Sequence, residues 1–403
     1  MRFNSFSAAT FVLTAILSTT LHAAEKRYGP GVTDTEIKFG QTMPYSGPAS
    51  AYSIQGVVEQ AYFKLLNQRG GINGRRINLI SLDDAYNPPK VVEQTRRLVE
   101  DDEVLAIVGT LGTPTNSAIH KYLNAKKVPH ILIASGATKW NDPKNFPWTM
   151  ALYPSYQLEG RVYGKYILNS KPAAKIAIIS QNDDFGRDYV KGFKDALGDK
   201  AKDLIVAEAT YEVTSPTIDS QIVALKASGA DTLFTVASPK FGAQAIKKVY
   251  ELGWKPLNMI VSVASSIGGV IEPIGAEKAQ GLITISVAKT PLDPNWNDDP
   301  DMKAYFAFMN EAGLKDKIVD FSSVTGYFTA VMLHKLVERC GDDLSRENLM
   351  NQARSINEPA LPLILPGITV KTTSDDFAPF HALRMQKFEG KSWVLFGDVI
   401  SDK

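Results

Sequence analysis

Short runs of Val, Ile and Leu alternate with longer amphipathic segments through the first third of the chain. In the first of these segments, Val57, Ala61 and Leu65 recur on one face at helical spacing, and Gly70-Gly71 follows as a helix stop. The pattern predicts strands at residues 37–42, 77–82, 104–108 and 131–134, and helices at residues 54–68, 89–100 and 114–126.

The same alternation recurs in the middle of the chain. It predicts strands at residues 175–180, 204–207, 232–236 and 258–261, and helices at residues 185–197, 218–227 and 241–252. Continuously apolar strands separated by helices are typical of parallel sheets that are covered on both faces. Two such runs predict an α/β protein with two similar, doubly wound parallel-sheet lobes.

The last third of the chain is too irregular to form a third lobe. It predicts a strand at 281–287, helices at 299–310, 321–339 and 346–354, and a hairpin at 381–388 and 393–399. These pieces are expected to complete the two lobes, so the chain crosses between them several times and forms a hinge. The expected division is residues 27–152 plus 284–354 for lobe 1, and residues 153–283 plus 355–403 for lobe 2.

The first 24 residues have the layout of a secretory signal peptide. Arg2 gives a positive start, residues 8–17 form a short apolar run, and Ala23-Ala24 offers small residues for cleavage. The alternative is a buried helix or a membrane anchor. We expect cleavage after Ala23 or Ala24 and a periplasmic mature protein. After residue 25, no tract reaches the roughly 18 apolar residues that a membrane span needs.

Charge and motifs exclude several classes of function. The 403 residues carry 44 Lys and Arg against 43 Asp and Glu, whereas nucleic-acid binders normally have a large basic excess. Cys340 is the only cysteine, so no internal disulfide forms. Phosphate-loop, H-E-x-x-H and G-x-S-x-G motifs are missing, and the five histidines are scattered. We therefore expect no catalysis, no metal and no cofactor, although a triad assembled from distant residues stays an alternative.

Ligands of open parallel sheets bind beyond the carboxyl ends of the strands. The loop after residues 104–108 contains Gly112, Thr113 and Pro114, with Thr113 expected as a helix N-cap. Free amides and partial positive charge at a helix N-terminus suit a carboxylate. A capped helix without a ligand is the plainer interpretation. The adjacent loop, Ser135 to Thr138, offers a second hydroxyl and further amides.

Other loops supply candidate walls. Tyr52 follows the first strand, and Phe185 follows a turn containing Asp183 and Asp184 in the second lobe. A surface turn for Tyr52 and a core position for Phe185 are the competing interpretations. The two acids are interpreted as cap and dipole partners of the next helix rather than as a catalytic pair. Further second-lobe loops contain the segments 237–239 and 264–266.

Several of these stretches together resemble the leucine/isoleucine/valine-binding proteins of ABC importers. The resemblance rests on the segments Ile-Lys-Phe-Gly and Ser-Gly-Pro near the start, Gly-Gly-Ile-Asn-Gly-Arg at 70–75, and residues 175–186. It covers essentially the whole mature chain. It implies a type I periplasmic-binding fold that closes on a ligand, no catalysis by this subunit, and a membrane permease as partner.

The resemblance also implies roles for individual residues. Thr113 and Thr138 match positions whose hydroxyl groups hold the ligand carboxylate, and Gly136 and Ala137 match backbone contacts in the same loop. Aromatic pocket walls of the family match two further residues, Tyr52 and Phe185.

The departures from the family concern the substrate. Amino-acid binders hold the ligand ammonium with an acid after the strand that corresponds to residues 258–261, but here the loop reads Ser-Val-Ala-Ser-Ser. The neighbouring position is a tyrosine in those proteins, and in this chain it falls near Ala237 or Ser238. A buried ammonium without an anionic partner costs several kcal/mol. We therefore expect a carboxylate that lacks the α-ammonium. Small residues at Gly112, Ala237 and Ala264 leave room for an aromatic or phenylpropanoid body, with short organic acids next.

The expected protein is thus a monomeric, exported solute-binding subunit. Three alternatives remain. One is a branched-chain amino-acid binder whose ligand ammonium is held by water or by Asp183. Another is a sensor that reports its ligand to a receptor. The third is an enzyme.

Overall fold

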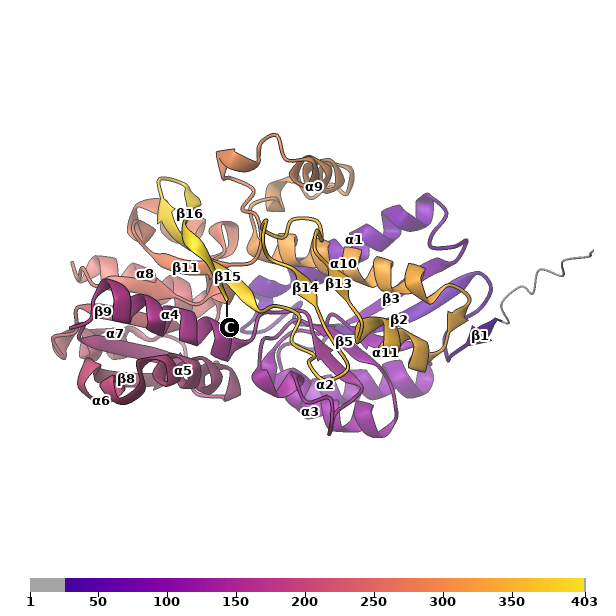
Figure 1. The fold of residues 1–403 in the computed structure, drawn as a ribbon, viewed down its shortest axis with the longest axis horizontal. Coiled ribbons are helices and arrows are strands. Elements are labelled where there is room, and N and C mark those ends of the chain that lie inside the picture. The colour runs from indigo at the N-terminus through magenta and orange to yellow at the C-terminus, as the bar shows by residue number, and fades with distance from the viewer. Residues whose placement is uncertain (1–25, 402–403) are drawn as a thin grey trace, which may run out of the picture.

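The computed structural model describes residues 26–401 and divides them between two α/β lobes that lie side by side (Figure 1). The signal-peptide prediction falls on residues 1–24, outside this range. The first lobe contains a five-stranded parallel sheet in the order β3-β2-β4-β5-β6. Its strands are β2 (Glu36–Met43), β3 (Arg76–Asp83), β4 (Ala106–Val108), β5 (His130–Ile133) and β6 (Thr149–Ala151).

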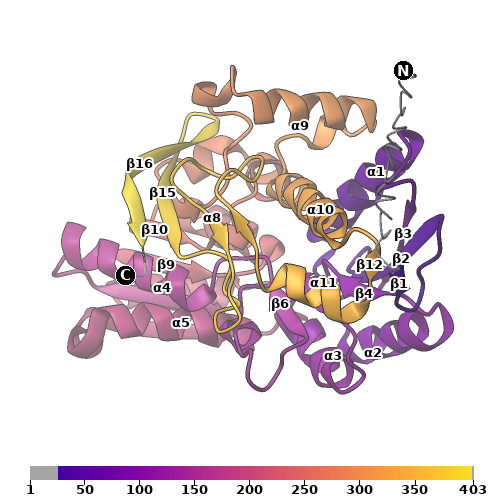
Figure 2. The ribbon, with the colours of Figure 1, turned by 45° about the vertical axis from the view of Figure 1, so that its right-hand side comes forward.

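Helices cover both faces of the first sheet because its strands are apolar on both sides. Ile107 of β4 packs with α2 and α3, whereas Phe39 of β2 packs on the side of α1 and α10. The helices are α1 (Ile54–Gln68), α2 (Pro88–Arg96), α3 (Thr113–Ala125), α9 (Pro300–Glu311), α10 (Phe321–Cys340) and α11 (Arg346–Ala353). Figure 2 shows α9, α10 and α11, from the last third of the chain, gathered with this lobe.

The second lobe repeats the strand order and extends it. Its seven-stranded sheet runs β8-β7-β9-β10-β11-β15-β16, of which the first five strands are parallel and the last two form an antiparallel edge hairpin. The strands are β7 (Ile176–Gln181), β8 (Ile205–Tyr211), β9 (Thr232–Val236), β10 (Leu257–Ile260), β11 (Ile283–Ser286), β15 (Ala382–Glu389) and β16 (Ser392–Ser401). The helices are α4 (Tyr156–Ser170), α5 (Asp184–Leu197), α6 (Ala201–Leu204), α7 (Asp219–Ala227) and α8 (Pro239–Glu251).

The predicted fold class, two doubly wound lobes with several crossings, is confirmed. The chain passes between the sheets after β6, after β11 and again before β15. The last two crossings pair with each other: Lys289 N–H donates to the Leu363 carbonyl at 2.7 Å, and Leu365 N–H donates to the Val287 carbonyl at 2.8 Å. This pairing joins the two passages into one hinge element.

One predicted boundary is wrong. The division at residue 284 cuts through β11, which pairs with β10 and β15 and so belongs to the second sheet. An apolar strand alone does not reveal which of two sheets it joins, and only the pairing decides this. The return to the first lobe therefore begins after Ser286.

Helix α10 is largely buried along its length, including its last residue. Cys340, its last residue, is 5% exposed, and burial raises the pKa of its thiol to about 12. A thiol that stays protonated is a poor nucleophile. Within residues 26–401, no helix combines the length and apolar character that crossing a membrane requires.

Candidate ligand-binding site

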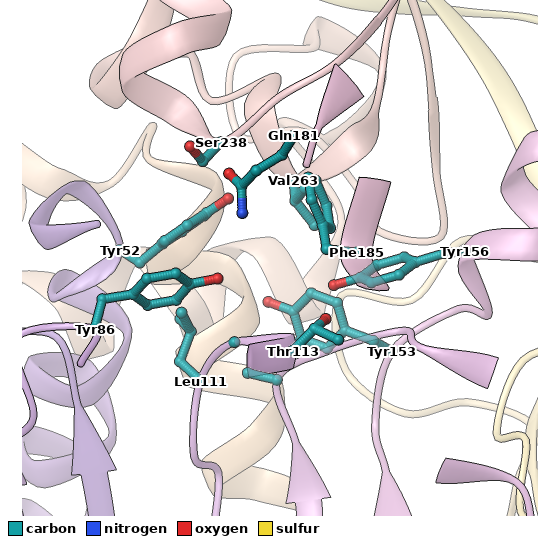
Figure 3. Close-up of a pocket in the computed structure, with 12 residues that line it drawn as sticks. Tyr52, Tyr86, Leu111, Thr113, Tyr153, Tyr156, Gln181, Phe185, Ser238 and Val263 are labelled. Carbon is teal, nitrogen blue, oxygen red and sulfur yellow. The ribbon is translucent and has the colours of Figure 1, made fainter. Parts of the chain in front are cut away.

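A hollow lies between the lobes where the strand-to-helix loops of both sheets meet. It contains about 380 Å³ of empty space, part of it open to solvent. The first lobe contributes loops after β2, β3, β4 and β5, the second contributes loops after β7, β9 and β10, and the first crossing, after β6, adds two tyrosines (Figure 3). The lining residues are Tyr52, Tyr86, Leu111, Gly112, Thr113, Ala134, Tyr153, Tyr156, Gln181, Phe185, Ser238 and Val263.

Five of the nine residues predicted from the sequence line this pocket: Tyr52, Gly112, Thr113, Phe185 and Ser238. They come from four loops and from both lobes, at the carboxyl ends of the strands, where ligands of parallel sheets are expected to bind. Phe185 is 5% exposed and meets the edge of Tyr156 at a ring-centroid distance of 5.3 Å. It is both a core residue and a pocket wall, so its two competing interpretations describe the same position.

Gly112 occupies a position that only glycine fits. Its φ of 99° lies in the left-handed region, and an added Cβ would stand 2.4 Å from the Tyr86 ring. Tyr86 itself has a φ of 56°, stabilised by its N–H donating to Asp84 at 2.7 Å. Strained backbone of this kind concentrates at functional sites. Here it lays the Tyr86 ring directly against the first turn of α3.

The N-cap prediction for Thr113 is wrong by one residue. Gly112 is the N-cap, with no side-chain cap, and Thr113 already belongs to the helix. The Thr113 hydroxyl instead shares a hydrogen bond of 2.8 Å with Ser135 of the neighbouring loop. Gly112 tolerates a positive φ because it has no side chain, and α3 begins directly after it. The first amides of α3 therefore lack a capping side chain and border the pocket.

Three hydroxyl groups at the pocket make no hydrogen bond within the described residues. Ser238 is 4% exposed, and its Oγ has no hydrogen-bond partner among the described residues. The phenol groups of Tyr52 and Tyr86 likewise make no hydrogen bond to any residue from 26 to 401. Burial raises the pKa of both phenols well above the usual value, so they remain protonated donors.

An amide and two more phenols complete the polar lining. Gln181 is held from behind, because its Nε2 donates to Asp183 at 2.6 Å and its Oε1 accepts from Tyr211 at 3.3 Å. Tyr153 donates to Gln55 at 3.3 Å. Burial raises the pKa of Tyr156 to about 12. Figure 3 shows the phenol oxygens of these tyrosines directed at the central space.

None of the twelve lining residues is charged. Even the acid behind the wall is kept uncharged: Glu59 is 2% exposed, and burial raises the pKa of its carboxyl to about 8. Gln55 joins Glu59 to the wall, since it donates to that carboxyl at 3.0 Å and accepts from Tyr153. Asp183, the nearby acid of the second lobe, is occupied by Gln181 and by the Gly186 N–H.

The remaining predicted residues lie elsewhere. Thr138 does not face the pocket: its N–H and hydroxyl both donate to Asp188 of α5, at 2.7 and 2.9 Å. Gly136 lets the chain approach Pro154, whose carbonyl oxygen would lie 2.0 Å from an added Cβ. With Ala137, these residues line a neighbouring hollow instead. Thr138 therefore lies outside the lining of this pocket, with both donors bound to a carboxylate of the protein.

Ala264 is also outside the lining. It is fully buried in the loop after β10, and Val263 takes the pocket position beside it. No acid appears there in the structure either, so the residue that faces the ligand space is apolar.

A family model described as "Periplasmic binding protein" matches residues 36–392. The chain belongs to this family. Among curated relatives, an amino acid binding protein of Pseudomonas aeruginosa is 26% identical over 206 residues, covering 49% of this chain and 53% of the relative. The first curated relatives are matched over 53–61% of their length.

Solved structures of this type I periplasmic-binding fold align over nearly the whole chain. A branched-chain amino acid ABC transporter protein of Thermus thermophilus with bound valine has a TM-score of 0.82 at 18% identity, over 92% of this chain and 98% of that one. A solute-binding protein of R. palustris in complex with benzoate has a TM-score of 0.76 at 18% identity, over 91% and 98%. At these identities the likeness establishes the fold alone.

Sequence reasoning missed most of the aromatic lining. Tyr86, Tyr153, Tyr156 and Gln181 all reach the pocket. Gln181 ends β7, so its place at the carboxyl end of a strand was a usable signal. The other three lie in a strained turn and at the first crossing, where neither periodicity nor motif marks them.

Proposed function

We propose that this protein is the solute-binding subunit of an ABC importer and that its ligand is a small carboxylate without an α-ammonium group. Membership in the periplasmic-binding family supports the first part. The single observation that carries the second is a tyrosine-rich pocket between the lobes with no charged lining residue.

The absence of an acid in the lining disfavours an amino acid. An ammonium group that enters such a pocket loses its water, and without an anionic partner this costs several kcal/mol. Two acids close to the site, Asp183 and Glu59, do not offer that partner. Asp183 is engaged by two donors, and Glu59 lies behind the wall with a pKa of about 8.

A carboxylate, in contrast, finds donors without needing a cation. Tyr52 and Tyr86 present unpaired hydroxyl groups from the first lobe, and Ser238 presents one from the second. The N-termini of α3 and α8 border the same space, and neither N-cap side chain closes its helix. Free amides and helix dipoles favour negative charge there. Closure would then place donors from both lobes on one ligand.

The aromatic walls favour a ring in the ligand body. Phe185, Tyr156 and Tyr189 form one cluster, with Tyr156 stacked on Tyr189 at 4.4 Å. Aromatic pairs of this geometry are worth about 0.5–1.5 kcal/mol beyond burial. We therefore propose an aromatic or phenylpropanoid acid; the benzoate complex of the R. palustris protein is consistent with this class.

A branched-chain amino-acid ligand is the second candidate, since relatives carry that description and the Thermus thermophilus protein binds valine. The pocket would then have to supply water or Asp183 for the ammonium. A role as a ligand sensor uses the same site and differs only in the partner, a receptor instead of a permease.

A thermal-shift screen of the refolded mature protein tests the proposal. Unfolding and refolding first removes any ligand carried through purification. One set of compounds contains aliphatic amino acids, and the other contains aromatic and aliphatic carboxylates without an amine. A true ligand at about 100 times its Kd adds roughly 2.7 kcal/mol of stability. Stabilisation by leucine or valine, and by none of the simple acids, would overturn the ligand class while leaving the family unaffected.

A further inference from the structure

Two segments from opposite lobes meet beside the pocket: the loop after β5 and helix α5. The loop after β5 turns Thr138 toward α5 of the second lobe. There the Thr138 N–H and hydroxyl both donate to one oxygen of Asp188, at 2.7 and 2.9 Å. The other Asp188 oxygen accepts from Gln157 at 2.6 Å. Three donors thus surround one carboxylate, as they would surround a small bound acid.

The three donors divide unequally between the lobes. Gln157 begins α4, which packs along α5, so it travels with Asp188 and holds that side chain in position. Both Thr138 donors belong to the first lobe. Opening the cleft would therefore break the two Thr138 hydrogen bonds and leave the Gln157 bond intact. Asp188 is already oriented for the Thr138 loop before the lobes meet.

A neighbouring ion pair crosses between the lobes at the same place. Lys139 Nζ lies 2.7 Å from Asp184, one turn before Asp188 on α5. The loop after β5 also hydrogen-bonds to the third crossing, the segment before β15. Asn141 donates to Asp376 at 2.9 Å and accepts from the Phe377 N–H at 2.6 Å. The exposed ion pair contributes little by itself. The Asp188 carboxylate, partly buried and bound by three donors, is the stronger link.

We propose that Asp188 acts as a built-in carboxylate ligand of the Thr138 loop. It holds the lobes together without solute and keeps the acid group of an incoming ligand away from the Thr138 donors. The ligand carboxylate is thereby confined to the donors of Thr113, Tyr52, Tyr86 and Ser238. This last consequence rests on the proposed function; the closure does not.

Ligand-free protein provides the test, so its result is independent of the ligand's identity. Small-angle X-ray scattering measures the radius of gyration of the refolded wild type and of Asp188→Ala. We expect a larger radius for the variant, because the two Thr138 bonds are lost. Asp195→Ala is the matched control: Asp195 lies on the same helix, and its ion pair with Lys191 stays within that helix. An unchanged radius in Asp188→Ala would refute the proposal.

Chemical rescue separates a bound carboxylate from a general packing role. Removal of the Asp188 carboxyl leaves a space of that shape, and formate supplies the missing group. We expect excess formate to return the radius of Asp188→Ala toward the wild-type value, whereas formamide, of similar size and no charge, does not. Equal effects of both, or of neither, would contradict the proposal. Thr138→Val provides the reciprocal variant, with a smaller opening that formate does not reverse.

Discussion

The two neighbouring parts of the interlobe cleft differ in charge. The pocket presents phenols, one amide and one serine hydroxyl, with no charged side chain in its lining. A few residues away, the rim made of Thr138, Lys139, Asp184 and Asp188 carries charges that pair across the lobes. Polar groups at the rim are satisfied by the protein, whereas in the pocket the hydroxyl groups of Tyr52, Tyr86 and Ser238 have no partner among the described residues. This contrast supports the proposals that the rim holds the lobes together and that the pocket takes the ligand.

The sharpest way to break this contrast is to place a charge in the pocket. Ser238→Asp adds a carboxylate among groups that offer it no cation, where it also repels the proposed ligand. A buried unpaired charge costs about 3 kcal/mol, which corresponds to roughly 100-fold weaker binding. Isothermal titration calorimetry measures the change in Kd. Ser220→Asp, on the exposed surface of α7 in the same lobe, is expected to bind normally.

Full affinity in Ser238→Asp would show that the ligand does not contact this part of the cleft. Tighter binding of amino acids by the same variant would support the ammonium argument from the opposite direction, because the new acid supplies the missing partner.

The second prediction concerns the neutral acid behind the pocket wall. Burial raises the pKa of Glu59 to about 8 from an ordinary value of 4.5, so the folded protein holds a proton that the unfolded chain releases. The free energy of unfolding should then fall as pH rises from about 5 to about 8, by at most about 1.4 kcal/mol per pH unit for this group. Glu59→Gln should reduce that slope and be the more stable protein at pH 8.

Urea denaturation at several pH values measures this slope. Glu93→Gln, an exposed change on α2, serves as the control and should leave the slope as it is. If Glu59→Gln and the wild type lose stability in parallel between pH 5 and 8, Glu59 is charged in the folded state. The wall of the pocket would then have a charged acid behind it.

The third prediction tests the close approach of Tyr86 to the start of α3. Gly112→Ala forces a side chain into a left-handed conformation, at about 1–3 kcal/mol, and against the Tyr86 ring. Gly229→Ala, at a φ of 77° with nothing within 4 Å, carries the backbone strain alone. We expect Gly112→Ala to lower the denaturation midpoint further than Gly229→Ala, and only Gly112→Ala to weaken ligand binding.

The smallest effects are expected for single hydroxyl groups. Tyr52→Phe and Tyr86→Phe each remove one donor to the ligand and keep the ring, which should weaken binding about 2- to 10-fold. Tyr250→Phe, at a residue 53% exposed on α8, is the control. Wild-type Kd values for both pocket variants, measured by calorimetry, would show that these phenol groups donate no hydrogen bond to the ligand.

Regular elements were predictable where side chains alone decide them. The bounds of α1 and β9 agree with the sequence prediction, but the apolar face predicted for α1 does not: Val57 is 36% exposed, and Val58 and Phe63 are the buried apolar residues of this helix. Helix α4 was missed. Its Gly160 and Gly164 let α5 approach so closely that an added Cβ at either would lie within 3 Å of atoms on α5. A search for apolar side chains gives no weight to glycine, although glycine makes this packing possible.

The site was predictable to the extent that it follows from strand ends. Loops after β4, β7 and β9 supply Thr113, Phe185 and Ser238 as expected. The Thr138–Asp188 contact was not predictable, because it joins residues 50 positions apart and exists only when the lobes meet. Tyr86 escaped notice because its left-handed backbone depends on Asp84, which no local pattern reveals.

The most direct test compares two ligands that differ only in the α-ammonium group. Calorimetric titration of the refolded protein with 3-phenylpropanoate and with phenylalanine keeps ring and carboxylate the same. A second pair, 4-methylpentanoate and leucine, does so for a branched aliphatic body. In whichever pair shows binding, the account predicts that the acid without an amine binds at least about 100-fold more tightly than the amino acid. The reason is that a buried unpaired ammonium costs several kcal/mol. Tighter binding of phenylalanine or leucine would contradict it.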